Sequence, residues 1–334
     1  MQLLTWLQAA NQGLMEEMAR DSSIFVMGED AQAAIFGLTA GLIEPFGPER
    51  VRNTPISEAA IVGTGVGAAM VGMRPFIDLN IATFSYVAFD QIVNQAAKNR
   101  FLFGGQAKLP LVINLNCFYR SYTAAQHTDR PHGLFMAMPG LKIVAPGTPA
   151  DAKGLIKSAI RSDDPVLFFS DMTSWGLKGD VPEDPDFLVP IGPARVAVKG
   201  SDVTIVSIMA LQIALGAAKK LEDDHGINAE VIDLRTLAPL DEDAIIDSVA
   251  KTGRLVIVDI AHETAGGAAE VAAIAAEHCF GMLRAPVVRV CTPDIHIPFS
   301  PTLERTFFPT PDSVVRAAVH TVQYSGAVGA GAHR

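Results

Sequence analysis

Strand-like and helix-like segments alternate along the second half of the chain, and this alternation limits the folds that the chain can adopt. Aliphatic and β-branched runs predict buried strands, and the amphipathic runs between them predict helices. The predicted strands are residues 202–208, 229–234, 255–260 and 287–291, and the predicted helices are residues 211–221, 241–252, 268–280 and 311–322. Strands separated by helices require right-handed crossovers, which give a mainly parallel sheet covered on both faces. A doubly wound α/β domain is expected.

The first half of the chain shows the same alternation with clearer helix-start signals. Thr5 precedes an amphipathic run, and Thr148-Pro149-Ala150-Asp151 combines a capping hydroxyl, a proline at the first helical position and an acid in the first turn. Predicted strands cover residues 24–27, 74–80, 111–115, 141–145 and 165–170, with helices between them. A second doubly wound domain with a mainly parallel sheet is therefore expected.

A stretch without periodicity separates the two halves. Residues 175–193 contain repeated glycine, proline and acidic residues, a composition typical of a connection between domains. We expect a first domain at residues 1–175, a linker at 176–195 and a second domain at 196–324. The Gly- and Ala-rich tail at 325–334 is expected to be disordered.

The composition argues against several classes of protein. Hydrophobic residues make up 49% of the 334 residues and charged residues only 19%, which favours a large interface with another subunit. A net charge of −10 without a basic cluster argues against a nucleic-acid partner, and no apolar run approaches the roughly 20 residues of a membrane span. Three scattered cysteines form no disulfide framework or zinc pattern, and the first residues lack a secretory basic region. A cytoplasmic protein without a membrane partner is expected.

Glu58 stands at the start of a predicted helix whose following residues are almost all small and apolar. Thr54-Pro55 favours a turn before it, and Ser57 is a candidate cap. Residues 61–70 are mostly Gly, Ala, Val and Met, so we expect this helix to be buried. A first-turn acid often only complements the helix dipole. A buried carboxylate without a neighbouring cation has a raised pKa, which favours a functional role instead.

Further polar residues follow the predicted strands of the first half. Glu29 and Asp30 follow the strand at 24–27, and ligands of open α/β sheets bind at such carboxyl ends. Acidic turns are also common there without any function. Phe84 follows the strand at 74–80, where an aromatic residue suits the core as well as a ligand platform.

Two histidines occur in one polar stretch after the strand at 111–115. His127 and His132 accompany Asp129 and Arg130, and this segment is too polar to be predicted as core. Histidines in loops are commonly only solvated, but two of them beside an acid and a base favour catalysis. Their spacing does not match a helical metal site.

A set of short motifs lies in one order along residues 1–323. They include Pro55-Ile56-Ser57-Glu58, Phe89-Asp90-Gln91-Ile92, Ala125-Gln126-His127, Pro139-Gly140-Leu141-Lys142, Glu230-Val231-Ile232-Asp233-Leu234-Arg235 and Pro298-Phe299-Ser300-Pro301-Thr302-Leu303-Glu304. In order and spacing they resemble the β subunit of the E1 component of 2-oxoacid dehydrogenase complexes, especially its pyruvate and acetoin dehydrogenase branch. The resemblance implies a transketolase-like pyrimidine-binding domain followed by a transketolase C-terminal domain.

The resemblance also implies an enzyme that uses thiamine diphosphate. Glu58 would bond to N1′ of the cofactor's pyrimidine ring and favour the imino tautomer, whose nitrogen takes the C2 proton. Phe84 matches the aromatic residue on which the pyrimidine stacks, and His127 matches the catalytic histidine. Glu29 and Ile56 are the other cofactor-binding residues that the resemblance implies.

The chain lacks one motif of a complete site. No Gly-Asp-Gly sequence occurs, and Gly179-Asp180-Val181 in the predicted linker is not one. In the family that motif holds the diphosphate and its Mg²⁺ on the α subunit, so the resemblance implies an α2β2 heterotetramer. A lipoyl-bearing E2 acyltransferase is a further implied partner.

The chain departs from the family between Asn114 and Tyr122. An Arg-Gly-Pro-Asn-Gly-like sequence of small residues is usual there, and this chain has the bulkier Phe118, Tyr119 and Tyr122 instead. These rings would narrow the acceptor channel. Its candidate lining residues are Arg120, Tyr122, Asp129, Arg130 and His132.

A monovalent-cation site, for K⁺, is also implied by the resemblance. It would consist of backbone carbonyl groups, which carry no side-chain signal in the sequence. The corresponding residues are Leu111, Ala159, Ser162 and Asp164.

Three functions stay open at this point. The first is an E1-type β subunit that helps to decarboxylate a 2-oxoacid, or to cleave an acyloin such as acetoin, and passes the acyl group to a lipoyl acceptor. The second is a split-subunit carboligase or transketolase-type enzyme with a different acceptor. The third is a non-catalytic scaffold subunit, against which the presence of Glu58 and His127 argues.

Overall fold

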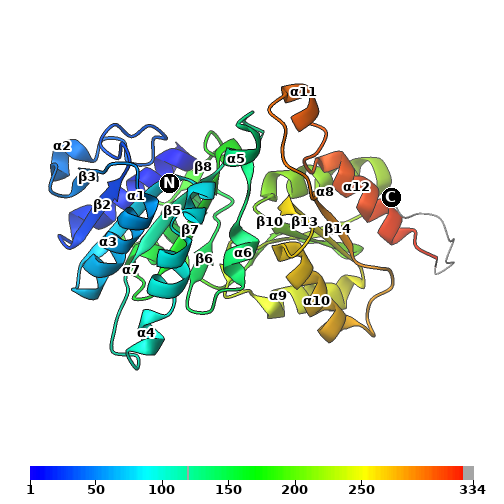
Figure 1. Ribbon diagram of the computed structural model, residues 1–334. Coiled ribbons are helices and arrows are strands. Elements are labelled where there is room, and N and C mark those ends of the chain that lie inside the picture. The colour runs from blue at the N-terminus through cyan, green and yellow to red at the C-terminus, as the bar shows by residue number, and fades with distance from the viewer. Residues whose placement is uncertain (119, 326–334) are drawn as a thin grey trace. The chain divides into compact units, whose positions relative to one another are not determined.

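The structure of the protein is a computed structural model that describes residues 1–118 and 120–325. Tyr119 and all but the first residue of the expected tail lie outside these residues. The chain forms two compact units (Figure 1). Unit 1 consists of Met1–Pro193, Arg235–Leu240 and His296–Phe307, and unit 2 of Ala194–Leu234, Asp241–Ile295 and the chain from Phe308 onward.

Unit 1 is built on a seven-stranded sheet. Its order is β12 (Thr236–Ala238), β6 (Lys142–Val144), β7 (Val166–Asp171), β5 (Val112–Cys117), β4 (Arg74–Ile81), β2 (Ile24–Gly28) and β3 (Val51–Asn53). All pairs are parallel except β12 with β6. The carboxyl ends of the central strands therefore meet at one edge, where β4 is followed by the 3₁₀ helix η1 (Ala82–Tyr86).

Helices cover both faces of this sheet (Figure 1). On one face α1 (Trp6–Arg20) packs against α7 (Pro149–Arg161), and their apolar residues form a core with the strands. Thr5 and Thr148 cap these two helices as their sequences predict. On the other face lie α3 (Glu58–Met70) and the π-helix η2 (Gln91–Ala96). The short elements of unit 1 are α2 (Ile43–Phe46), α4 (Asn99–Leu102), α5 (Ala124–Thr128), α6 (His132–Met136), η3 (Met172–Ser174) and α11 (Pro301–Glu304).

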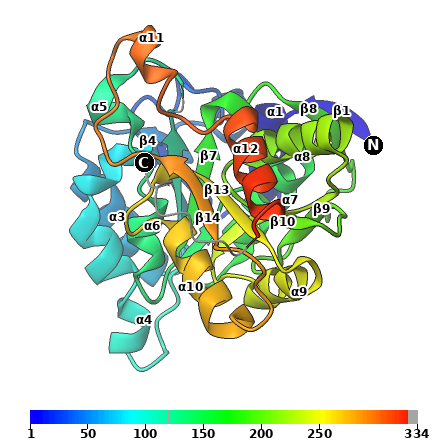
Figure 2. The same ribbon diagram turned by 90° about the vertical axis from the view of Figure 1, so that its right-hand side faces the viewer.

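Unit 2 is a smaller doubly wound sheet, as the alternation in the sequence predicts. Its order is β14 (Val288–Thr292), β13 (Leu255–His262), β10 (Val203–Ile208), β11 (Ala229–Asp233) and β9 (Arg195–Val198), all parallel except β9. Helices α8 (Leu211–His225) and α12 (Pro311–Val322) lie on one face, with α9 (Glu242–Thr252) and α10 (Gly267–Cys279) on the other (Figure 2).

Some local expectations were wrong. The predicted linker contains β8 (Lys178–Val181), which pairs with β1 (Gln2–Thr5) at the start of the chain. Asn116 and Cys117 belong to β5 rather than to the loop that follows it. These short pairings join residues that are distant in sequence, so local periodicity does not reveal them.

Helix α3 is not buried on all sides as the sequence predicts. Ile61, Val62 and Val66 face the sheet, whereas Met70 at its end is 42% exposed and Val71 just beyond it is 82% exposed. Ser57 stands at the cap position, but its side chain makes no capping hydrogen bond. Among residues 1–118 and 120–325, one apolar face of α3 is therefore left uncovered.

Two helical glycines provide a test of the α1–α7 packing. A Cβ atom on Gly13 would lie 2.7 Å from Ile156 Cγ2 and 3.0 Å from the Lys153 carbonyl oxygen, while one on Gly67 in α3 would meet nothing within 4 Å. Both substitutions by alanine gain roughly 1 kcal/mol of helix propensity. We expect Gly13→Ala nevertheless to lower the free energy of unfolding by about 1–2 kcal/mol through overpacking. Gly67→Ala is the matched control and should raise it in urea unfolding of the isolated chain. Equal effects of the two would contradict the packing.

Candidate active site

A small pocket lies at the carboxyl ends of β2 and β4 in unit 1. Its cavity is only about 10 Å³, room for about one water molecule. The lining residues are Glu29, Ile56, Glu58, Ile61, Asp78, Leu79, Asn80 and Phe84. All four residues expected to bind the cofactor, Glu29, Ile56, Glu58 and Phe84, are thus brought together by the fold.

Each of these residues has a definite structural origin. Glu29 follows β2, Glu58 is the first residue of α3, and Phe84 lies in η1 directly after β4. Glu58 is half-buried rather than enclosed, and Ile56 is 71% exposed. The carboxylate of Glu58 is therefore still open to solvent in this structure.

Asp78 and Asn80 line the same pocket and were not predicted from the sequence. Asp78 is 5% exposed, and its Oδ1 accepts hydrogen bonds from the backbone N–H of Asn80 (3.0 Å) and from Nδ2 of Asn114 (2.9 Å). Asn80 has a left-handed φ of 59° and donates from Nδ2 to the Glu29 carbonyl oxygen (3.2 Å). The available signal was a pair of polar residues in an otherwise apolar strand.

His127 lies in α5, next to the pocket. Its ring packs against the Phe84 ring in a T-shaped arrangement, with a centroid distance of 5.5 Å and an interplanar angle of 85°. Its buried Nδ1 atom has no hydrogen-bond partner within residues 1–118 and 120–325. The histidine is thus joined to the pocket through Phe84 and keeps a nitrogen available for a further group.

The polar stretch around His127 differs from the expectation in its burial. His132 is fully buried at the start of α6, where its ring packs on Phe169, and Arg130 is only 3% exposed. Arg130 donates from Nη1 to the Thr128 carbonyl oxygen (2.5 Å), a hydrogen bond within the same stretch. The expectation that this stretch is too polar for a core was therefore wrong, because distant strands cover it.

Asp129 remains partly exposed beside Tyr86. The Tyr86 hydroxyl donates to Asp129 Oδ2 at 3.4 Å. Burial, followed by the charge of Asp129 and this hydrogen bond, raises the pKa of Tyr86 above its usual range. Tyr86 therefore stays a neutral donor to Asp129 at neutral pH.

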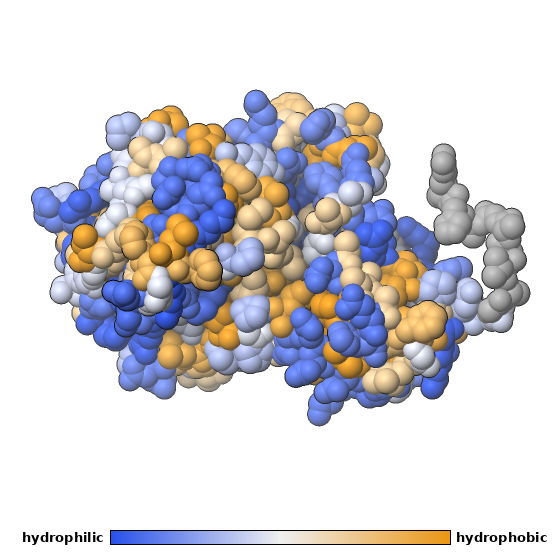
Figure 3. Space-filling model, turned by 60° about the horizontal axis from the view of Figure 1, so that its bottom comes forward, coloured by the Kyte–Doolittle hydropathy of each residue, from blue (hydrophilic) through white to orange (hydrophobic). Residues whose placement is uncertain are grey.

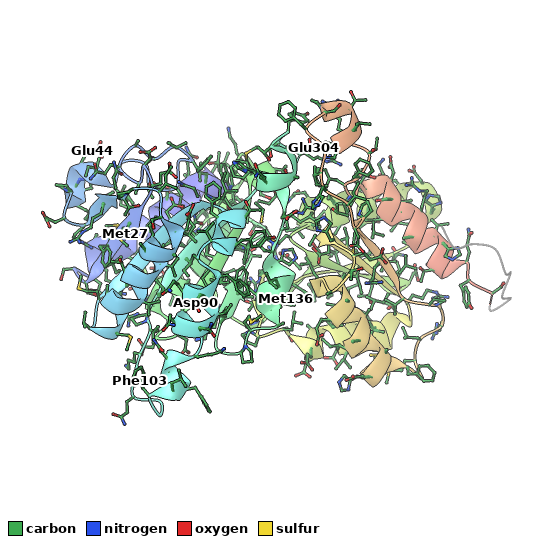
Figure 4. The ribbon with its side chains drawn as sticks, viewed as in Figure 1. Met27, Glu44, Asp90, Phe103, Met136 and Glu304 are labelled. Atoms are coloured by element: carbon green, nitrogen blue, oxygen red, sulfur yellow. The ribbon has the colours of Figure 1, made fainter. Side chains whose placement is uncertain are left out.

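Hydrogen bonds with Glu304 of α11 and with Arg305, the next residue, hold the loop before α5. Arg120, Tyr122 and Ala124 all have a left-handed φ, between 56° and 60°, a conformation that costs free energy for residues other than glycine. The Tyr122 backbone N–H donates to Oε1 of the fully buried Glu304 (3.2 Å), and Arg305 Nη2 donates to the Tyr122 hydroxyl (2.9 Å). Figure 4 shows Glu304 on α11 beside α5. These bonds stabilise the strained loop.

The four carbonyl groups expected to bind a cation all accept hydrogen bonds from the protein. Their donors are the Val166 N–H to Leu111 O (2.8 Å), the Ser162 N–H to Ala159 O (3.2 Å), Arg74 Nη1 to Ser162 O (3.0 Å) and Ser162 Oγ to Asp164 O (3.0 Å). The guanidinium of Arg74 is itself paired with Asp163 (2.7 Å) and Asp21 (3.8 Å), which offset its charge. A carbonyl oxygen has two lone pairs, so the K⁺ site at these four groups stays a prediction.

No metal-binding cluster or membrane helix is seen in the described parts of the chain. Within residues 1–118 and 120–325, no three His, Cys, Asp or Glu side chains are grouped as metal ligands. In the same residues, no helix has both the length and the apolar character needed to cross a bilayer.

The fold and site together define the transketolase-like class. Residues 2–174 match the family model of the transketolase pyrimidine binding domain, and residues 192–314 match that of the transketolase C-terminal domain. A solved split-gene transketolase, described as an inactive β4 tetramer, has a TM-score of 0.78 and 26% identity, with 96% of this chain and 98% of that chain covered. A transketolase from Pichia stipitis shares the fold at 16% identity and a TM-score of 0.69, over 47% of its own length.

Curated relatives identify the family within this class. The 2-oxoisovalerate dehydrogenase β subunit of Bacillus subtilis is 44% identical over 95% of this chain and 98% of its own. The acetoin:2,6-dichlorophenolindophenol oxidoreductase β subunit of the same organism is 41% identical (94% and 95%), and the pyruvate dehydrogenase E1 β subunit of Rickettsia felis 42% (96% and 99%). The chain belongs to the family of dehydrogenase E1 β subunits, which confirms the resemblance inferred from its motifs.

Asp171 gives a pH-dependent test of this strand edge. It ends β7, is buried, and accepts hydrogen bonds from the Thr173 N–H (3.0 Å) and Oγ1 (2.6 Å). Burial raises its pKa from 3.8 to about 6, although these bonds and the charges of Arg130 and Arg120 lower it. The folded state thus binds a proton that the unfolded state has lost between these values.

The stabilising effect of that proton should disappear as the pH rises. We expect the free energy of unfolding of the wild type, minus that of Asp171→Asn, to fall by roughly 1–3 kcal/mol between about pH 4 and 6 and to stay level above. Urea unfolding at a series of pH values measures it. A difference that rises with pH would show that Asp171 is stabilised as a carboxylate instead.

Proposed function

We propose that this chain is the β subunit of a thiamine diphosphate-dependent E1 enzyme that decarboxylates a 2-oxoacid, or cleaves an acyloin, and passes the acyl group to a lipoyl acceptor. The observation that carries the proposal is the grouping of Glu29, Ile56, Glu58 and Phe84 around one pocket, with His127 against Phe84. The β subunits that it resembles support the same reaction class. The expected division at 1–175, 176–195 and 196–324 enters the proposal as the two family domains and their linker.

Each residue of the pocket has a role in this proposal. Thiamine diphosphate, when bound, supplies a thiazolium C2 centre that adds to carbonyl carbon once it has lost its proton. Glu58 holds a proton at N1′ of the pyrimidine, and Phe84 provides an aromatic face for that ring. Ile56 and Glu29 border the ring. His127 is placed to give or take a proton at the substrate or to orient the acceptor.

The size of the cavity supports the need for an α subunit. A cavity that holds about one water does not enclose an aminopyrimidine, which supports completion of the site by another chain. We propose that this α subunit holds the diphosphate and Mg²⁺, that the assembly is α2β2, and that an E2 acyltransferase accepts the acyl group. Arg120, Tyr122 and Asp129 remain candidates for the acceptor channel, with Arg130 and His132 supporting them from the interior.

Uncovered apolar surface supports the same partner. Large apolar side chains are exposed at both ends of α3, before η2 and at α4: Ile56, Val71, Val87, Phe101, Leu102 and Phe103. Figure 3 shows apolar residues (orange) at the surface of this part of the chain, on the left of the view. Phe103 is labelled at α4 in Figure 4. Patches of this kind mark interaction sites in folded proteins.

The first test is the dependence of cofactor binding on the α subunit. With Mg²⁺ present, we expect no saturable binding of thiamine diphosphate by this chain alone at concentrations that saturate the complex of both chains. Isothermal titration calorimetry measures both. Equal binding by the isolated chain would contradict the shared site.

The complex should also reduce lipoamide when supplied with a 2-oxoacid or acetoin.

Glu58→Gln tests the central carboxylate. The amide keeps the size of the side chain but cannot share the N1′ proton, so exchange of the cofactor's C2 proton, followed by NMR in the complex, should be nearly abolished. His127→Ala is the matched control: it should exchange normally and lose turnover by roughly 10²-fold. Exchange at the wild-type rate in Glu58→Gln would leave Glu58 only a dipole-stabilising role.

A split transketolase is the second candidate, supported by the likeness to the solved split-gene protein. The higher identity to dehydrogenase β subunits makes it the weaker one. Transfer of a two-carbon unit between sugar phosphates by the complex, without lipoamide reduction, would favour this second function.

A further inference from the structure

Asp78 is a buried carboxyl group at the pocket that the roles above do not use. It lies on β4 between Gly28 of β2 and Asn114 of β5, its partners in the parallel register. The fit to β2 is close, since a Cβ atom on Gly28 would lie 2.3 Å from the Asp78 carbonyl oxygen. The pairing of these strands therefore fixes the position of the Asp78 backbone.

The two oxygens of Asp78 differ in their surroundings. Oδ1 accepts both hydrogen bonds, from the Asn80 N–H (3.0 Å) and from Asn114 Nδ2 (2.9 Å). Oδ2 makes no hydrogen bond within the described residues, and the side chain lines the pocket. Because an oxygen that accepts two N–H bonds is a poor site for a proton, a proton on this carboxyl group belongs on Oδ2.

The charges around Asp78 favour its neutral form. Glu29 and Glu58 line the same pocket, whereas no Lys, Arg or His does so among the residues that the structure describes. On the side of β5 the neighbour is the neutral amide of Asn114, at the first position of the stretch that replaces the family's usual Arg-Gly-Pro-Asn-Gly-like sequence. Burial raises the pKa of Asp78, and its two hydrogen bonds only partly oppose this. Three carboxylates around one small cavity would repel one another.

We propose that Asp78 is a second carboxyl group of the cofactor site, which stays protonated at neutral pH and donates a hydrogen bond from Oδ2 to the bound aminopyrimidine. Glu58 and Asp78 would then differ in role, one as the carboxylate that shares the N1′ proton and the other as a neutral donor. Sites that set two carboxyl groups apart by their environments are known to separate such roles. This inference rests on the proposed function, because the pyrimidine is its acceptor.

Two other buried aspartates provide matched controls. Asp171 at the end of β7 and Asp259 within β13 also accept a backbone N–H two residues on, Asp171 from Thr173 (3.0 Å) and Asp259 from Ala261 (2.8 Å). Neither lines the pocket. Asp171 interacts electrostatically with Arg130 and Arg120, which belong to the stretch around His127. Asp259 lies in unit 2 and is therefore the better control for binding.

The protonation state can be measured without cofactor. In the isolated chain at about pH 8, above the Asp171 pKa of about 6, the infrared difference between wild type and Asp78→Asn should contain the carbonyl stretch of one neutral carboxylic acid. Asp171→Asn under the same conditions should remove only a carboxylate band. Loss of a carboxylate band in Asp78→Asn would overturn the proposal.

Binding to the complex tests the donor itself. Asparagine keeps an acceptor at Oδ1 and places an N–H donor where Oδ2 was, so Asp78→Asn and the control Asp259→Asn should bind thiamine diphosphate with Mg²⁺ like the wild type. Asp78→Ala should bind roughly three- to tenfold more weakly, the scale of one neutral hydrogen bond. Wild-type binding should weaken as the pH rises and Asp78 loses its proton, and Asp78→Asn should lack this dependence.

These measurements distinguish failure of the neutral-donor proposal from failure of the proposed function. Equal weakening in Asp78→Asn and Asp78→Ala, or no weakening in either, would overturn the neutral donor while the wild-type complex still binds cofactor. Failure of the wild-type complex to bind thiamine diphosphate would instead overturn the proposed function, and the infrared result on the isolated chain would stand apart from it.

Discussion

The parallel pairing of β2, β4 and β5 is the constraint on which the rest of the site depends. Because the three strands run in one direction, Gly28, Asp78 and Asn114 are register partners, and the segments that follow the strands leave from the same edge. Glu29 and Phe84 reach the pocket only through that common edge. Asp78 on β4 is thus placed beside Glu29, which follows β2, by the direct pairing of the two strands. Such rigid support suits a site that must hold a ring in one orientation.

The pocket is acidic, and the arrangement of its acids matters more than their number. Glu58 keeps contact with solvent in this chain, whereas Asp78 is held inside the sheet edge by two N–H donors. Two carboxyl groups of the same pocket therefore lie in different environments, one open to solvent and one buried. Around it the strained loop at Tyr122 is tied to Glu304, so the surroundings of His127 depend on residues almost two hundred positions away.

Much of this was predictable from sequence, and the exceptions share a cause. Helix starts at Thr5 and Thr148 follow from local chemistry, and the alternation of strands and helices predicts both sheets. Glu58 and Phe84 were identified through family motifs rather than physics alone. The burial of His132, the pairing of β8 with β1 and the role of Asp78 were missed, because each depends on contacts between segments distant in the chain. Periodicity reports which face of an element is apolar, but it does not report what covers that face.

The uncovered face of α3 and the aromatic residues at α4 have a consequence for the cell. Val71 and Phe101 are more than four-fifths exposed in the free chain, and apolar surface of this kind promotes association of any molecules that remain unpaired. A surplus of this chain would therefore be removed from solution by aggregation or degradation, and its useful concentration would be set by the supply of its partner. Balanced synthesis of the two chains is then a requirement that the fold itself imposes.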